Sequence, residues 1–134
     1  MSRLMSVSLT EDAVRERRKT VTRRLGWRFL KPGDRLTLCR KVMGRKAGEP
    51  LVRIAEVEVV SVRREPLFAM TDDDVAREAV PPRYPDGRMR FDEWYMDRLI
   101  DALPTAAAWV TWFAWEMGCR PDDDVTRIEW RYLS

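Results

Sequence analysis

A short basic segment near the N-terminus carries the side chains best suited to chemistry. Residues 19–24 read KTVTRR, so a lysine, two threonines and two arginines follow one another closely. A threonine hydroxyl can act as a nucleophile, and a lysine whose pKa is lowered can activate it. Arginine can hold a phosphate or a carbonyl oxygen. The same residues also occur on the solvated rim of ordinary strands, so the segment predicts a basic site without fixing a reaction.

The absence of histidine narrows the chemistry considerably. It excludes Ser-His-Asp and Cys-His mechanisms and most zinc sites. The two cysteines, Cys39 and Cys119, are too few for a disulfide framework and lack metal-site spacing. Residues 122–124 form a run of aspartates, which a turn before a strand explains. We therefore expect neither a metal nor another cofactor.

Aromatic residues supply a second kind of candidate site. Trp27 follows the basic segment in a loop that also contains Arg28, close to Arg23 and Arg24. There the indole could stack on a base while the arginines bind phosphate, or it could anchor the loop in the core. The near-helical spacing of a second group predicts packing in the core or against a partner. That group is Trp109, Trp112 and Phe113.

Composition and charge indicate one domain over residues 1–134. The chain is 45% hydrophobic and 35% charged, as is usual for a globular protein. Residues 1–46, hereafter the basic half, hold 14 lysines and arginines against 4 acidic residues, a net charge of +10. Such a segment attracts RNA or single-stranded nucleic acid, unless the acidic remainder of the chain neutralises it. Without an apolar span or a signal peptide, we expect a cytoplasmic protein with no membrane association.

Alternating and helical patterns provide the elements that must position these residues. The pattern predicts strands over residues 6–9, 19–24, 35–42, 51–62 and 125–133. It predicts helices over 11–18, 71–79, 91–103 and 105–117. The strands over 35–42 and 51–62 follow one another in the sequence and should form a hairpin. Strands at both ends with helices between them predict an α+β fold, a compact antiparallel barrel with peripheral helices.

Strand alternation raises a geometric condition for the basic segment. It places Thr20, Thr22 and Arg24 on one face of the strand and Lys19 on the other. Lys19 can share a cleft with Thr22 only if it lies at the start of the strand, where the chain still turns.

The basic segment and the turn after it resemble the signature of the ASCH family. Residues 18–24 (RKTVTRR) are followed by 31–34 (KPGD) and a strand, where members typically carry G-x-K-T-x-x-x-R and a G-D turn. The resemblance covers residues 6–79 and 124–133 and leaves out a helical insert at about 80–118. Arg18 departs from the glycine or small residue of many members. The resemblance implies a small antiparallel PUA-like β-barrel with peripheral helices, related to domains that bind RNA.

The resemblance also implies a reaction. The sequence is similar to small bacterial N4-acetylcytidine amidohydrolases, in which a lysine and a threonine of this strand and a glutamate of the following helix are catalytic. Carried over, these residues are Lys19, Thr22 and Glu78. They imply hydrolysis of an N-acylated pyrimidine nucleoside, in which Lys19 deprotonates Thr22 and Glu78 donates a proton.

Two other functions stay open at this point. A non-catalytic RNA- or DNA-binding module needs only the basic cleft, with Arg23, Arg24, Trp27 and Arg28 as binding residues. A protein-interaction factor would use the tryptophan-rich helix 105–117 as an exposed patch. Small arginine-rich ASCH proteins are also familiar from bacteriophages, which suggests a phage origin as a further expectation.

Overall fold

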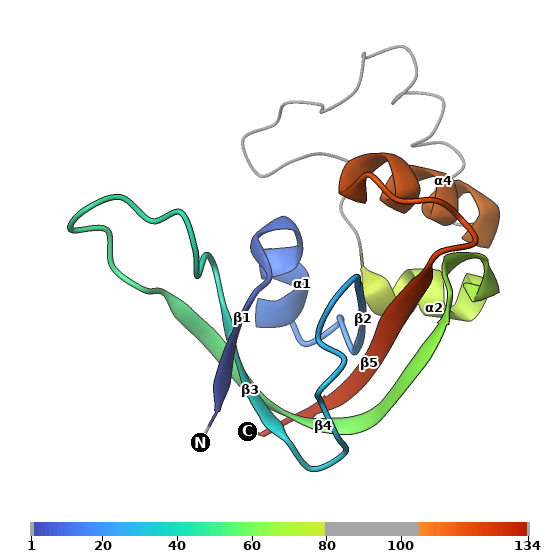
Figure 1. Cartoon of the computed structure of the whole chain (residues 1–134). Helices are drawn as coiled ribbons and strands as arrows, with labels where there is room; N and C mark the ends of the chain where they lie inside the picture. Colours follow the sequence, from blue (N-terminus) through green and yellow to red (C-terminus); the bar gives the residue numbers. More distant parts are fainter. Residues whose placement is uncertain (1, 80–104, 134) are drawn as a thin grey trace.

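The computed structural model describes residues 2–79 and 105–133, which form a five-stranded sheet with helices against it (Figure 1). The strands are β1 (Arg3–Ser6), β2 (Val21–Arg24), β3 (Arg35–Cys39), β4 (Arg53–Pro66) and β5 (Asp124–Tyr132). The helices are α1 (Glu11–Arg15), α2 (Asp72–Glu78) and α4 (Ala106–Met117), with short 3-10 turns η1 (Ser8–Thr10) and η2 (Leu67–Ala69). Within the described residues, no helix is both long and apolar enough to cross a membrane.

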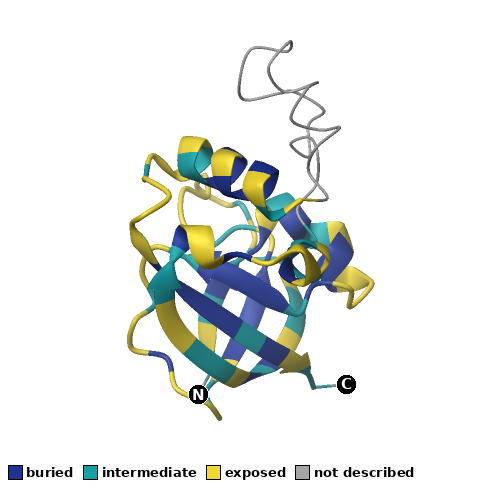
Figure 2. Ribbon diagram, turned by 90° about the vertical axis from the view of Figure 1, so that its right-hand side faces the viewer, coloured by how far each residue is buried: buried dark blue, intermediate teal, exposed yellow. Residues whose placement is uncertain are grey.

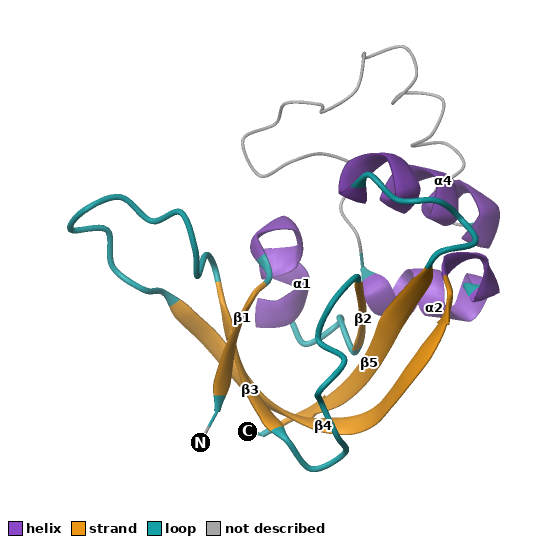
Figure 3. Ribbon diagram, viewed as in Figure 1, coloured by secondary structure: helices purple, strands orange, loops and turns teal. Residues whose placement is uncertain are grey.

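The strands form one curved layer in the order β1-β3-β4-β5-β2 (Figure 3). The predicted hairpin is confirmed, since β3 and β4 pair antiparallel with Leu36 opposite Val57. The long strand β4 continues past this pairing and pairs with β5, with a register shift between Val59 and Ser61. Such an irregularity bends a strand, and the sheet curls around α1 into a half-barrel.

The α+β barrel class is thus confirmed, with one pair of strands that the prediction did not include. β1 and β3 run parallel, with Met5 opposite Leu38, whereas the other pairs are antiparallel. The strand predicted over residues 6–9 is wrong, because β1 ends at Ser6 and η1 follows. Met5 and Val7 are the buried apolar residues of this stretch, so the alternating pattern was real but began earlier in the chain.

The helix boundaries follow capping residues that are visible in the sequence. Thr71 accepts a hydrogen bond from the Asp74 amide, and Thr105 accepts one from the Ala108 amide, at the starts of α2 and α4. Gly118 ends α4 in the left-handed conformation with φ of 67°. The predicted helix 11–18 is shorter, since α1 ends at Arg15. The predicted helix 91–103 and most of the insert lie outside the described residues.

The core divides into two clusters of buried side chains. One lies between the sheet and α1 and includes Met5, Leu36, Leu38 and Ile128. The other lies under α4, where Trp109 and Phe113 pack with residues of η2 and β5. Figure 2 shows the buried positions mainly in the middle of the sheet and on the parts of the helices that face it. Between these two clusters lies the segment that carries Lys19 and Thr22.

Candidate functional site

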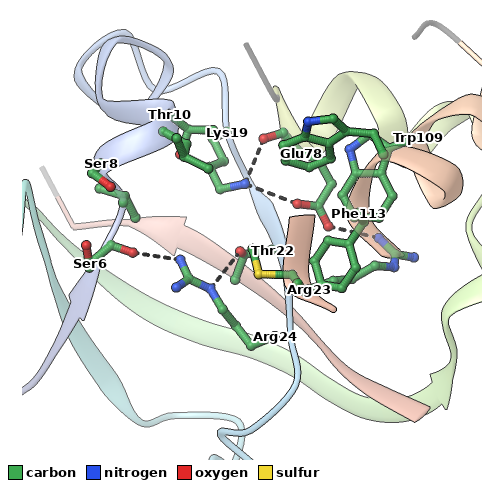
Figure 4. A pocket seen from close by; sticks show the side chains of 14 residues that line it. Ser6, Ser8, Thr10, Lys19, Thr22, Arg23, Arg24, Glu78, Trp109 and Phe113 are labelled. Atoms are coloured by element: carbon green, nitrogen blue, oxygen red, sulfur yellow. Dashed lines mark hydrogen bonds and ion pairs between the residues drawn. The ribbon is translucent and has the colours of Figure 1, made fainter. Parts of the chain in front are cut away.

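A pocket of about 190 Å³ lies where the β1–η1 turn, β2, the end of α2 and α4 come together (Figure 4). Lys19, Thr22, Arg24 and Glu78 all line it. Glu78 is distant from the other three residues in the sequence, and the fold brings all four to one pocket. The volume exceeds the roughly 150 Å³ of a cavity that holds a benzene ring. The pocket therefore has room for one planar ring with a small substituent.

Lys19 lies at the start of the strand, as the alternation required for a shared cleft. β2 begins at Val21, so Lys19 precedes the alternating residues. Its backbone carbonyl accepts hydrogen bonds from Trp130 Nε1 at 3.0 Å and from Tyr132 Oη at 2.5 Å. These two side chains from β5 fix the backbone of Lys19. Its side chain consequently turns into the pocket beside Thr22 (Figure 4).

The Lys19 ammonium is buried against the C-terminal end of α2. Lys19 Nζ donates to the Glu78 backbone oxygen at 2.7 Å and to Glu78 Oε1 at 3.2 Å. Both side chains are 3% exposed. Burial lowers the pKa of Lys19, and although Glu78 opposes the shift, Arg24 and Arg23 add to it. A lysine in such surroundings gives up its proton more readily than a solvated one.

Thr22 and Arg24 form the neighbouring part of the pocket. Arg24 Nε donates to Thr22 Oγ1 at 3.2 Å, and Arg24 Nη2 donates to the Ser6 backbone oxygen at 2.8 Å. Among the described residues Arg24 has no carboxylate partner, so its charge is available to a ligand oxygen. Burial lowers the pKa of Arg24, yet a guanidinium stays protonated at any physiological pH.

Arg23 differs from the other arginine of the segment. Its guanidinium forms ion pairs with Glu65, Asp74 and Glu78, and its side chain is 0% exposed. Arg23 touches the pocket from behind and has no surface to offer a nucleic acid. The sequence analysis grouped Arg23 with the binding residues. Alternation shows which face of the strand a residue lies on, but it does not show whether acidic side chains pack against that face.

Trp27 and Arg28 lie outside the pocket. Trp27 is half-buried, packs against the cluster under α1 and has its ring 5.4 Å from that of Phe29. Arg28 is exposed in the same loop. This placement agrees with the anchoring role of Trp27 that was left open beside base stacking.

The apolar wall of the pocket comes from α4, and sequence reasoning missed it as part of the site. Trp109, Trp112, Phe113 and Met117 line the cavity. Trp109 and Phe113 stack with centroids 5.1 Å apart, so the wall is a packed aromatic layer. The predicted burial of Trp109, Trp112 and Phe113 is confirmed. Helical spacing showed that these rings share a face but could not show that a cavity lies beside them.

No cluster of three or more metal-ligating side chains of His, Cys, Asp or Glu occurs in the described part of the chain. The acidic run at 122–124 is exposed, with Asp122 and Asp123 in a turn and Asp124 at the start of β5. From the described residues, the pocket lining offers ammonium, guanidinium and hydroxyl groups and one carboxylate, that of Glu78. Such a set suits an anionic or carbonyl oxygen better than a cation.

Comparison with known proteins identifies the fold. The chain resembles the crystal structure of an ASCH domain from Lactobacillus crispatus JV V101, with a TM-score of 0.52 and 14% identity over 98% of this chain and 79% of that one. It also resembles protein EF3133 from Enterococcus faecalis V583, a DUF984 protein, with a TM-score of 0.58 and 11% identity over 99% and 76%. No protein-family profile matches the sequence, and no curated protein sequence does. The chain has an ASCH-like fold, and at these identities the likeness shows the fold alone.

Proposed function

We propose that this protein is an amidohydrolase that removes the acyl group from an N-acylated pyrimidine nucleoside. The observation that carries the proposal is the convergence of Lys19, Thr22, Arg24 and Glu78 on one pocket. A buried lysine of lowered pKa, a hydroxyl and an arginine that no carboxylate of the described residues pairs with are the parts that amide cleavage needs in a protein without histidine.

In the first step Thr22 adds to the amide carbonyl and forms a tetrahedral intermediate. Neutral Lys19 takes the hydroxyl proton as Thr22 Oγ1 attacks the carbonyl carbon of the amide. The carbonyl oxygen becomes an oxyanion, which Arg24 stabilises because its guanidinium already lies beside Thr22 Oγ1. Placing this charge in a buried pocket makes the arginine more effective than it would be in water.

The second step expels the amine. The C–N bond breaks, which leaves the acyl group on Thr22 as an ester, and the leaving nitrogen takes the proton that Thr22 gave up. Lys19 and Glu78 share that proton across 3.2 Å, so Glu78 can deliver it after Lys19 has passed it on. Water then hydrolyses the Thr22 ester. Lys19 accepts a proton from the attacking water and returns it to Thr22 Oγ1 as the ester bond breaks, which restores the neutral lysine and the hydroxyl. The products are the free base amine and the carboxylic acid.

The size of the pocket favours a single base over a polymer segment. About 190 Å³ accommodates one ring and a small acyl group, and a ribose has to remain at the opening. The aromatic layer of Trp109, Trp112 and Phe113 offers a surface on which a planar base can lie.

An assay on acylated nucleosides tests the proposal. A panel of N4-acylated cytidines should be hydrolysed, and Lys19→Ala should abolish turnover while the far-UV spectrum keeps the signal of a folded protein. Lys31→Ala is the matched control, because Lys31 is exposed and lies outside the pocket. No turnover on the whole panel by the folded parent protein would reject the amidohydrolase.

A non-catalytic binding module is the second candidate, and one observation favours it. Thr22 Oγ1 is bonded to Arg24 rather than to Lys19, and Lys19 caps a carbonyl at the end of α2. A lysine at that place also stabilises a helix, since it meets the negative end of the helix dipole. If the protein only binds a base, Lys19→Ala should weaken binding and destabilise α2 without any reaction to lose.

The interaction-factor alternative would require α4 to present its tryptophans outward. Trp109 and Trp112 are buried, whereas Trp115 is 63% exposed. The main aromatic face of α4 packs in the core and lines the pocket, so this alternative has less support than the other two.

A further inference from the structure

Arg23 lies directly behind the pocket and connects it to a buried network of charges. Its Nη1 is 3.1 Å from Glu78 Oε2, and its Nη2 is 2.7 Å from Asp74 Oδ2 and 3.0 Å from Glu65 Oε1. We propose that Arg23 is a positioning residue of the site, which fixes Glu78 and limits its pairing with Lys19. The inference rests on the proposed function only in giving Lys19 the role of a base.

Stability alone gives little reason for an arginine at this position. Burying charges costs free energy that ion pairs often fail to recover, so apolar residues in place of Arg23 and its carboxylate partners together would stabilise the fold as well. Arg23 also buries its Nε, which has no hydrogen-bond partner among the described residues. A side chain that is 0% exposed and incompletely satisfied calls for another explanation.

The geometry divides the Glu78 carboxylate between two cations. Oε1 faces Lys19 Nζ at 3.2 Å, and Oε2 faces Arg23 Nη1 at 3.1 Å. If Arg23 were absent, the whole carboxylate charge would serve Lys19, and the ammonium would hold its proton more firmly. Arg23 also acts directly, because its positive charge is one of the causes, after burial and Arg24, that lower the pKa of Lys19. Both effects keep Lys19 able to act as a base.

The charged groups around this pair come from several elements. Lys19 is faced by Glu78 of α2 and by Arg23 and Arg24 of β2. The groups that face Arg23 are Glu65 of β4, Asp74 and Glu78 of α2, and the Trp109 ring of α4, whose centroid is 5.9 Å from the guanidinium carbon. Glu78 is common to both sets, so the indirect effect of Arg23 on Lys19 passes through Glu78.

A substrate-free titration tests the inference. The chain has four lysines, and only Lys19 is buried, so side-chain nitrogen NMR can follow its ammonium separately. In Arg23→Gln the Lys19 resonance should titrate at a higher pH than in the parent protein. Arg127→Gln is the matched control, because Arg127 is 5% exposed and pairs with Asp74 but forms no ion pair with Glu78. In Arg127→Gln, Lys19 should titrate at the same pH as in the parent protein.

Equal Lys19 titrations in folded Arg23→Gln and Arg127→Gln would overturn the inference. Should Arg23→Gln fail to fold, Arg23→Lys and Arg127→Lys replace the pair. A single ammonium cannot reproduce the three-way contact of Arg23, so the shift should be confined to Arg23→Lys, and its absence there counts equally against the inference.

The two proposals fail in different ways. If the nucleoside panel gives turnover, the pH at which the rate levels off should rise in Arg23→Gln and should match the parent protein in Arg127→Gln. If the panel gives none, the amidohydrolase proposal falls, and the titration alone still decides whether Arg23 controls Lys19.

Discussion

At the scale of single residues, Glu78 has two opposing effects on Lys19: it holds the ammonium in place, and it raises the pKa of the lysine. Lys19 has to remain close enough to Glu78 to be positioned, yet a strong ion pair would keep it protonated. Burial and the two neighbouring arginines lower its pKa, and Glu78 raises it, with burial the larger effect. The balance explains why the carboxylate makes one contact with Lys19 and another with Arg23.

The substitution Thr22→Val separates chemistry from structure. The change is nearly isosteric, keeps the β-branch that suits a strand and removes the hydroxyl. Because Thr22 is buried and accepts from Arg24, we expect a loss of roughly 0.5–1.5 kcal/mol in the free energy of unfolding rather than a neutral effect. If Thr22 is the nucleophile, kcat should fall by several orders of magnitude.

Thr20→Val is the control for this change. The Thr20 hydroxyl also accepts from an arginine, Arg77 at 3.2 Å, but Thr20 does not line the pocket. A similar loss of stability with full activity is expected. Unchanged activity and unchanged ligand affinity in a folded Thr22→Val protein would remove Thr22 from the site.

The pH dependence of the reaction follows from the direction of the Lys19 shift. The base must be neutral, so kcat/KM should rise with pH through the lowered pKa of Lys19 and then level off below the value of about 10.4 of a free lysine. Between those two pKa values the unfolded chain binds more protons, so the Lys19 contribution to stability also rises with pH. A rate that falls over this range would contradict the base assignment.

At the scale of elements, α2 is held onto the sheet by Asp74. Its carboxylate accepts from Arg127 at 2.7 and 3.1 Å and from Arg23 at 2.7 Å. Burial pushes the pKa of Asp74 upward, but the hydrogen bonds from Arg127 and Arg23 outweigh it and hold the pKa well below its usual range. Since Glu78 lies on the same short helix, this anchor also sets the depth at which Glu78 enters the pocket.

Asp74→Asn should destabilise the protein by about 3–5 kcal/mol near neutral pH, because two buried arginines lose their shared carboxylate. Asp73→Asn is the control, since Asp73 is exposed on the same helical turn. The contribution of Asp74 is present above its unfolded pKa of about 3.9 and is lost as the pH falls toward the folded value. The difference between parent and variant, measured by urea unfolding, should therefore shrink below about pH 4. A constant difference would show that the ion pairs are not its cause.

The elements that could be predicted from sequence are those with local signals. Threonine caps define the starts of α2 and α4, Gly118 defines the end of α4, and alternation defines β3, β4 and β5. β1 was misplaced because its limits are set by parallel pairing with β3, to which the chain returns only some thirty residues later. The polar part of the site came from a motif in one strand, while its apolar wall on α4 depends on how distant elements pack, which periodicity does not encode.

At the scale of the whole molecule, folding uses part of the basic half for internal pairing. Ion pairs within the described residues involve Arg15, Arg18, Lys19, Arg23, Arg40 and Lys41. The partners of Lys19, Arg23 and Lys41 lie in the acidic remainder of the chain, as the neutralisation alternative expected. Another set is exposed and has no carboxylate partner in the described part of the chain: Arg3, Arg17, Arg28, Lys31, Arg35, Arg45 and Lys46. This second set is what a nucleic-acid backbone could still contact.

Salt dependence distinguishes a polymer partner from a free nucleoside. A single strand that contacts Z of the exposed cations loses affinity with a slope of about −0.7Z in log salt, because phosphates release counterions. A nucleoside carries no phosphate, so its binding should hardly respond to salt.

The double substitution Arg45→Glu with Lys46→Glu changes two exposed charges in the β3–β4 loop, outside the pocket. Strong, salt-sensitive oligonucleotide binding that weakens in this variant while nucleoside hydrolysis is unchanged would mean that the polymer is held on the surface and one base enters the pocket. Hydrolysis of nucleosides with no oligonucleotide binding at low salt would instead make the free nucleoside the substrate, because a cavity of about 190 Å³ can accept its base without any backbone contact.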